Sequence, residues 1–141
     1  PQVGGLRIGD DVELGSNTTV DCGAIDDTVL EDGVRIDNLC QIAHNVHVGA
    51  HTAMAAMVAV AGSARIGRHC MIAGCTGVIG HIVICDDVMV LGGTLVTKNI
   101  TKQGTYSAMF PAEPARDWGR KVARFRRLED LMARVKKLEQ K

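Results

Sequence analysis

The chain has 141 residues, which fits one domain with an appendage. Hydrophobic residues make up 46% of the chain but aromatic residues only 3%, so narrow layers of small aliphatic residues fit better than a compact core of large rings. A net charge of zero, with one Trp, one Tyr and two Phe, argues against a nucleic-acid-binding protein. The sequence has no run of about 18 apolar residues, so it predicts no membrane span.

The first 100 residues contain a six-residue repeat. Twelve residues at steps of six, from Leu30 to Val96, are all aliphatic, and Ile8, Leu14 and Val20 keep the same step upstream. The step from Val20 to Leu30 is longer than one hexad, so this hexad carries a four-residue insertion, which we place near residues 26–29. Four residues after each aliphatic position comes a small or β-branched residue, of the kind that fits a narrow β interior.

This period predicts a parallel β-helix of hexapeptide repeats over residues 1–100, with three hexads in each coil. The period resembles that of the hexapeptide-repeat class, and the resemblance implies left-handed winding. Crossover physics alone would favour right-handed connections.

Glycine and proline interrupt regular structure after the repeat, so we expect a connecting loop over residues 101–115. Apolar residues then recur at three- and four-residue steps, which predicts a single amphipathic helix over residues 116–141. Residues 115–141 contain ten Lys or Arg against four Asp or Glu, a charge of +6, and the rest of the chain therefore carries −6. Such a basic tail favours an anionic partner, although a solvated helix face would look the same.

One edge of the predicted prism carries residues suited to acyl transfer. Gly62 stands three hexads after His44, and Gly80 stands three hexads after Gly62 and directly precedes His81. We therefore expect His44 and Gly62 about 5 Å apart, with His81 about 10 Å from His44. A base beside an unshielded backbone N–H suits this chemistry, because the base takes a proton and the N–H stabilises an oxyanion. On spacing alone, the glycines could instead serve only to permit tight corners.

Several longer motifs are more specific than the hexad. They are G-G-L-R-I-G at Gly4–Gly9, D-D-T-V-L-E-D-G at Asp26–Gly33, I-D-N-L-C-Q-I-A-H-N at Ile36–Asn45, A-G-S-A-R-I-G-R-H-C-M-I at Ala61–Ile72, and G-H at Gly80–His81. With these motifs the chain resembles the UDP-3-O-acylglucosamine N-acyltransferases of lipid A synthesis along nearly its whole length. That family moves a 3-hydroxyacyl group from acyl carrier protein to the 2-amino group of the sugar.

The resemblance implies roles for individual residues. His44 matches the general base and Gly62 the oxyanion-binding N–H, while Asp37 is a candidate for orienting His44. The candidates for substrate binding are His81, Asn45 and Leu95, of which Leu95 falls where the family limits acyl-chain length. The candidates for contact with the carrier protein are Lys98, Arg68, Arg120 and Arg124.

The resemblance also implies a homotrimer with active sites between subunits, in the cytoplasm of a Gram-negative bacterium. The five cysteines, odd in number and without a C-x-x-C pair, suit a reducing compartment. No metal or cofactor is expected, because the thioester donor is already activated. The chain begins at Pro1 inside a repeat, and we expect a carboxyl-terminal fragment without the family's amino-terminal uridine-binding domain.

Three alternatives stay open. The first is a related carrier-protein-dependent O-acyltransferase of UDP-N-acetylglucosamine, against which the Q-I-A-H-N and G-H context argues. The second is a zinc enzyme of the carbonic anhydrase type, with His44, His47 and His51 as ligands, although their spacing does not require them to converge. The third is a structural scaffold with no catalytic role for His44. One departure from the family is Cys22, which stands where Arg is usual.

Overall fold

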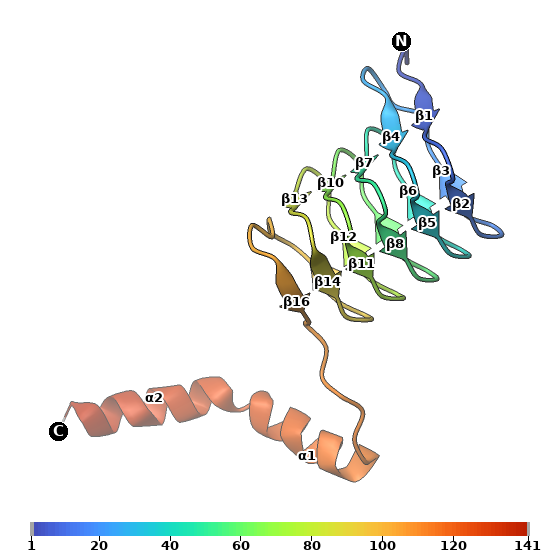
Figure 1. Cartoon of the computed structure of the whole chain (residues 1–141). Helices are drawn as coiled ribbons and strands as arrows, with labels where there is room; N and C mark the ends of the chain where they lie inside the picture. The colour runs from blue at the N-terminus through green and yellow to red at the C-terminus, as the bar shows by residue number, and fades with distance from the viewer. Residues whose placement is uncertain (1, 141) are drawn as a thin grey trace. The chain divides into compact units, whose positions relative to one another are not determined.

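A computed structural model describes residues 2–140, and Figure 1 traces the chain through its coils. The chain divides into two compact units, Pro1–Met109 and Phe110–Lys141. The first unit is a parallel solenoid whose short strands form three sheets.

The three sheets are the faces of the solenoid, and every strand pair is parallel. Sheet A consists of β1 (Leu6–Ile8), β4 (Thr28–Leu30), β7 (His47–Val48), β10 (Arg65–Ile66) and β13 (Val83–Ile84). Sheet B consists of β2 (Glu13–Leu14), β5 (Arg35–Ile36), β8 (Ala53–Met54), β11 (Met71–Ile72), β14 (Val88–Val90) and β16 (Gly104–Tyr106). Sheet C consists of β3 (Thr19–Val20), β6 (Gln41–Ile42), β9 (Ala59–Val60), β12 (Gly77–Val78) and β15 (Leu95–Val96).

The strand register reproduces the sequence period. Ile42 pairs with Val60 and Val60 pairs with Val78, so each residue lies beside the residue three hexads further on. The first coil is longer, because Val20 pairs with Ile42, four positions beyond the regular register. The four extra residues lie within residues 21–27, before β4 begins at Thr28, and thus earlier than the position predicted from the sequence.

The core consists of the two columns predicted from the repeat. Ile42, Val48 and Ile72 of the aliphatic column are buried, as are Val46 and Cys70 of the second column. The buried threonines also satisfy their polar groups: the Thr52 hydroxyl donates to the Gly67 carbonyl at 2.7 Å and accepts the Cys70 N–H at 3.0 Å. Burial raises the pKa of the Cys70 thiol, which is consistent with a structural role for that residue.

Two-residue corners join the faces, and the second residue of most corners has left-handed dihedrals. Among residues 2–140, eleven residues other than glycine have φ between 54° and 64°, and they include Asn45, Ser63, His69 and His81. Asn, Asp and His tolerate this conformation better than most residues do. These corner residues recur at a regular spacing along the solenoid, and most of them are polar, the exceptions being Leu39, Met57 and Cys75.

The solenoid continues beyond its predicted end. Where the sequence predicts a connecting loop over 101–115, residues Gly104–Tyr106 form β16 and pair with β14. The Tyr106 side chain packs against the core, so it prolongs the solenoid without the hexad pattern.

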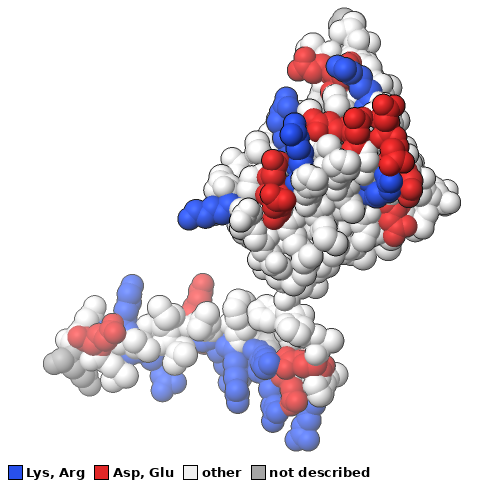
Figure 2. Space-filling model, in the orientation of Figure 1, with Lys and Arg blue, Asp and Glu red and all other residues white. Residues whose placement is uncertain are grey.

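The second unit contains two helices instead of the single helix predicted. These are α1 (Ala115–Phe125) and α2 (Leu128–Glu139). Arg127 lies between them with φ −101° and ψ 11°, and its N–H donates to the Arg124 carbonyl three residues back at 3.0 Å, as in a 3₁₀ turn. Neither helix buries a residue, and most of their Lys and Arg side chains gather on one side in Figure 2. Within residues 2–140, no helix combines the length and the apolar character needed to cross a membrane.

Candidate active site

His44 lies at the corner that follows β6, where sheet C turns into sheet A. Its imidazole covers the α-carbon of Gly62, one coil further on. A Cβ placed on Gly62 would lie 2.7 Å from both Cε1 and Nε2 of His44, closer than atoms can pack. Glycine at position 62 is therefore what allows the imidazole to lie in this position.

Gly62 also has a free backbone N–H. At three other corners the N–H in the equivalent position donates to an Asp or Asn one coil further on: Asp10 to Asp32, Ser16 to Asn38, and Arg68 to Asp86. The residue one coil after Gly62 is Gly80, which has no side chain that could accept the bond. Within residues 2–140 no acceptor pairs with the Gly62 N–H, so this donor is available to a ligand.

Backbone hydrogen bonds connect three successive coils at this corner. The Ser63 N–H donates to the His44 carbonyl at 3.0 Å, and the His81 N–H donates to the Gly62 carbonyl at 3.1 Å. His81 is exposed and lies in the same column as Asn45 and Ser63. The structure therefore brings His44, Gly62 and His81 together on one corner.

The Asn45 side chain faces the protein instead of solvent. Its Oδ1 lies 3.0 Å from Nδ1 of His44, and its amide group also bonds to the loop over residues 21–27. We expected Asn45 to bind substrate from the family motif. The structure shows that its amide bonds to His44 and to the loop, and a role in substrate binding stays a prediction. The sequence holds no signal for the contacts with the loop, because they come from an insertion outside the repeat.

Asp37 lies at a different corner from His44. It follows β5, at the corner between sheets B and C, and its Oδ1 accepts hydrogen bonds from the backbone N–H and side-chain amide of Asn38 at 2.8 and 2.9 Å. Asp37 and His44 stand near each other in the sequence, but the chain turns a corner between them. Within one chain the Asp37 carboxylate thus bonds to Asn38, and a role in orienting His44 stays a prediction.

A shallow strip of small residues lies on sheet C beside the His44 corner. Ala59 and Gly77 occupy successive outward positions, and Leu95 follows them one strand further on. Leu95 is 59% exposed, and its Cδ1 would lie 3.0 Å from a Cβ on Gly77, so its side chain leans over that glycine. Leu95 thus closes one end of the strip.

The basic residues expected to contact a carrier protein lie in both units, and the two in the solenoid, Lys98 and Arg68, stand at different corners. Lys98 is exposed in the same column as His44 and Gly62. Arg68 lies at the corner between sheets A and B, with its Nε 3.7 Å from Glu31. Arg120 and Arg124 are exposed on α1 in the helical unit, where Arg120 pairs with Asp117.

His44, His47 and His51, the candidate ligands of the zinc alternative, lie at different positions on the solenoid. His47 lies on sheet A with its Nε2 2.8 Å from Oε1 of Glu31. His51 lies at the corner between sheets A and B, where it stacks on His69 with ring centroids 5.3 Å apart. Among residues 2–140 no three His, Cys, Asp or Glu side chains are grouped so that they could hold a metal ion.

Glu31 directly follows β4, and its carboxylate contacts the His47 ring and the Ala50 backbone N–H. Its hydrogen bond with the His47 ring is the largest influence that lowers the pKa of Glu31 below the ordinary value of 4.5, and the hydrogen bond donated by the Ala50 N–H at 2.9 Å adds to it. Partial burial raises the pKa and opposes both.

We expect this network to make stability depend on pH. Because the pKa of Glu31 is lower in the folded state, its stabilisation is complete above about 4.5 and is lost as the pH falls through the folded value. Urea unfolding over this acidic range should show a shallower fall in unfolding free energy for Glu31→Gln than for wild type. Equal slopes would contradict the role of Glu31.

The period, the three parallel sheets and the buried aliphatic columns define a left-handed parallel β-helix of the hexapeptide-repeat class, which confirms the predicted fold class. LpxA from Acinetobacter baumannii has a similar structure, with a TM-score of 0.70 and 26% sequence identity, covering 74% of this chain and 42% of that one. No protein-family model matches the chain.

Curated relatives of higher sequence identity identify the family of acyltransferases that the chain resembles. The chain is 52% identical over 138 residues to the UDP-3-O-acylglucosamine N-acyltransferase of Delftia acidovorans, and 58% identical over 140 residues to the enzyme of that name from Pseudomonas fluorescens strain SBW25. These alignments cover 98% and 99% of the chain but 41% and 40% of the relatives. The chain is thus homologous over nearly all its length to UDP-3-O-acylglucosamine N-acyltransferases, which confirms the resemblance, and spans about 40% of their length.

Proposed function

We propose that the protein containing this chain transfers a 3-hydroxyacyl group from acyl carrier protein to the 2-amino group of UDP-3-O-acylglucosamine, in the cytoplasm and as a step of lipid A synthesis. The observation that carries the proposal is the corner where the His44 imidazole covers Gly62, whose N–H is free. The names of the curated relatives support the acceptor and the transfer to nitrogen, and the carrier-protein donor is part of the proposal.

In this mechanism the amine attacks the thioester carbonyl while His44 accepts the proton that the nitrogen must lose. The carbonyl oxygen becomes an oxyanion and accepts the Gly62 N–H. The oxyanion then re-forms the carbonyl as the C–S bond breaks, which leaves the amide, and the proton passes from His44 to the departing thiolate. His81 lies on the same corner and contacts the sugar substrate.

The surroundings of the corner suit such substrates. The strip over Ala59 and Gly77 takes the start of the acyl chain, and Leu95 limits how far it extends. A hollow beside the corner is lined by Asn45 and Ser63 and by charges of both signs, from Arg7 and Arg65 and from Asp26 and Asp27, so the two guanidinium groups could bind a diphosphate only against two nearby carboxylates.

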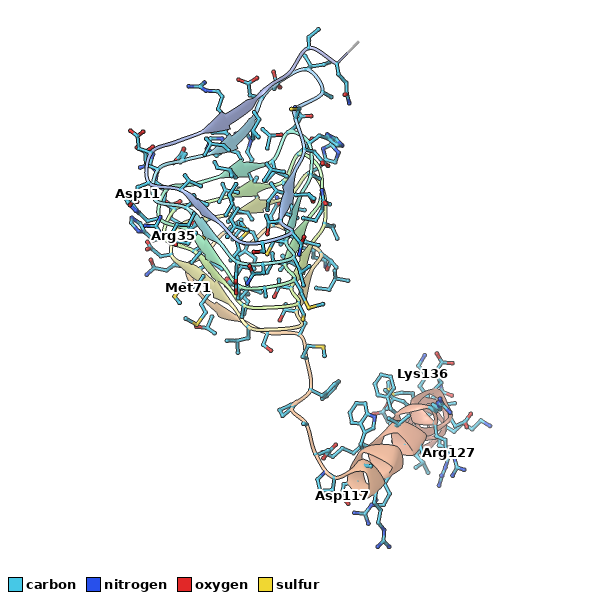
Figure 3. All side chains as sticks on the ribbon, turned by 90° about the vertical axis from the view of Figure 1, so that its right-hand side faces the viewer. Asp11, Arg35, Met71, Asp117, Arg127 and Lys136 are labelled. Atoms are coloured by element: carbon cyan, nitrogen blue, oxygen red, sulfur yellow. The ribbon has the colours of Figure 1, made fainter. Side chains whose placement is uncertain are left out.

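The carrier protein and a second subunit would meet other surfaces. The charge of +6 on residues 115–141 suits an acidic carrier protein through long-range attraction, with Lys98, Arg68, Arg120 and Arg124 available for contact. Sheet B and the helices leave apolar side chains exposed, including Met71, which projects from the same side of the solenoid as Arg35 in Figure 3. A homotrimer would cover such surfaces.

The test is acyl transfer by the complete protein from 3-hydroxyacyl carrier protein to two acceptors. With UDP-3-O-acylglucosamine we expect an amide product that mild alkali does not cleave. UDP-N-acetylglucosamine, which offers only hydroxyl groups, should not be acylated. An ester product on the second acceptor would favour the O-acyltransferase alternative, and stoichiometric zinc with hydrolyase activity would favour the carbonic anhydrase alternative.

A further inference from the structure

We infer that Asn45 is a positioning residue that holds neutral His44 with its proton on Nδ1, and that the insertion over residues 21–27 locks the Asn45 amide for this purpose. The inference rests on the proposed function for its catalytic meaning. Its structural content can be tested without any substrate.

The orientation of the Asn45 amide follows from its contacts with the insertion. Nδ2 lies 2.6 Å from the Asp26 carbonyl oxygen, which can only accept a hydrogen bond. Oδ1 lies 3.1 Å from the Ala24 backbone nitrogen, which can only donate one. Exchanging the amide oxygen and nitrogen would place donor against donor and acceptor against acceptor, so the oxygen must face Ala24.

The same oxygen lies 3.0 Å from Nδ1 of His44. Because this oxygen has no hydrogen, Nδ1 must be the donor, and the proton of the neutral imidazole resides there. Nε2 then keeps its lone pair, and it is the ring nitrogen that lies over Gly62. The tautomer fixed by Asn45 is therefore the one in which the base faces the candidate reaction centre.

The insertion explains why the amide is held so firmly. Gly23 is buried, and a Cβ there would lie 1.7 Å from the Asp26 carbonyl oxygen, so only glycine lets the loop fold back on itself. Its N–H donates to the Gly5 carbonyl at 2.9 Å, which ties the loop to the first coil. The Asn45 backbone is held as well, because its N–H donates to the Thr28 hydroxyl at 2.8 Å.

The test is nitrogen-15 NMR of the histidine rings in the complete protein, at a pH high enough for the rings to be neutral. Wild-type His44, assigned with His44→Gln, should carry its proton on Nδ1. Asn45→Gly removes the amide but accepts the left-handed φ of 61° without strain, and His44 should then shift toward the Nε2–H form that free histidine favours. Asn45→Asp keeps an acceptor opposite Nδ1 and should retain the Nδ1–H form, although it loses the bond that Nδ2 donates to the Asp26 carbonyl.

Activity supplies the second measurement. Asn45→Gly should lower kcat by about 10-fold or more, a part of what a general base contributes, with Asn45→Asp recovering some of the loss. The control is Asn38→Ala, because Asn38 accepts the Ser16 N–H at 2.7 Å on another corner and should affect neither the tautomer nor kcat. A wild-type His44 protonated on Nε2, or an unchanged tautomer in Asn45→Gly, would overturn the inference. The Nδ1–H form in a protein without transferase activity would support it while refuting the proposed function.

Discussion

Replacing His44 with alanine is expected to lower kcat for acyl transfer by about 10²-fold to 10⁴-fold, the range that a general base contributes. The side chain is exposed, so its loss removes no core contact, and thermal unfolding should change little. The measurement is the steady-state rate with saturating carrier-protein donor, compared with the wild type at equal folded concentration.

A matched control for this variant exists in the same chain. His51→Ala removes another exposed corner histidine, which stacks on His69 away from the candidate site, and should leave kcat unchanged. Equal losses in the two variants would mean that the His44 effect is structural. Full activity in His44→Ala would remove His44 from the mechanism and favour the scaffold alternative.

Gly62→Ala is expected to lower kcat by about 10²-fold, the lower end of the cost of losing one oxyanion donor. The new methyl group would lie 2.7 Å from two atoms of the His44 ring, and this exposed ring can move away more easily than the backbone can. The substitution therefore displaces the base and crowds the free N–H at the same time, while the core remains intact.

The control for Gly62→Ala is Gly92→Ala. Gly92 occupies the equivalent position of another corner, where the nearest atom to an added Cβ is the Gly74 carbonyl oxygen at 3.3 Å. Circular dichroism and urea unfolding should find both variants folded, with only Gly62→Ala impaired in transfer. If Gly62→Ala retained wild-type kcat, neither the ring position nor the N–H could matter as proposed.

The sequence was sufficient to predict the solenoid because each hexad repeats the same pattern of buried and exposed positions. Aliphatic residues at every sixth position can all be buried only when the chain turns after each hexad, and the observed strand register follows from three hexads per coil. The position of His44 relative to Gly62 follows from the same arithmetic, since one coil separates them.

Features outside the period could not be predicted in this way. β16 joins sheet B through backbone pairing with β14 and the packing of Tyr106, neither of which has a hexad signature. The break between the helices at Arg127 has no Gly or Pro to mark it. The contacts of the Asn45 amide with Ala24 and Asp26 come from the insertion that interrupts the repeat, so the motif that contains Asn45 does not predict them.

The most direct test of the account is a crystal structure of the complete protein with a bound, non-hydrolysable analogue of 3-hydroxyacyl-pantetheine. We predict that the analogue's carbonyl oxygen accepts the Gly62 N–H, that its carbonyl carbon lies on the Nε2 side of His44, and that the acyl chain runs along Ala59 and Gly77 toward Leu95. An analogue bound with its carbonyl at another corner, such as the one beside His51 and His69, would contradict the assignment of this corner as the active site.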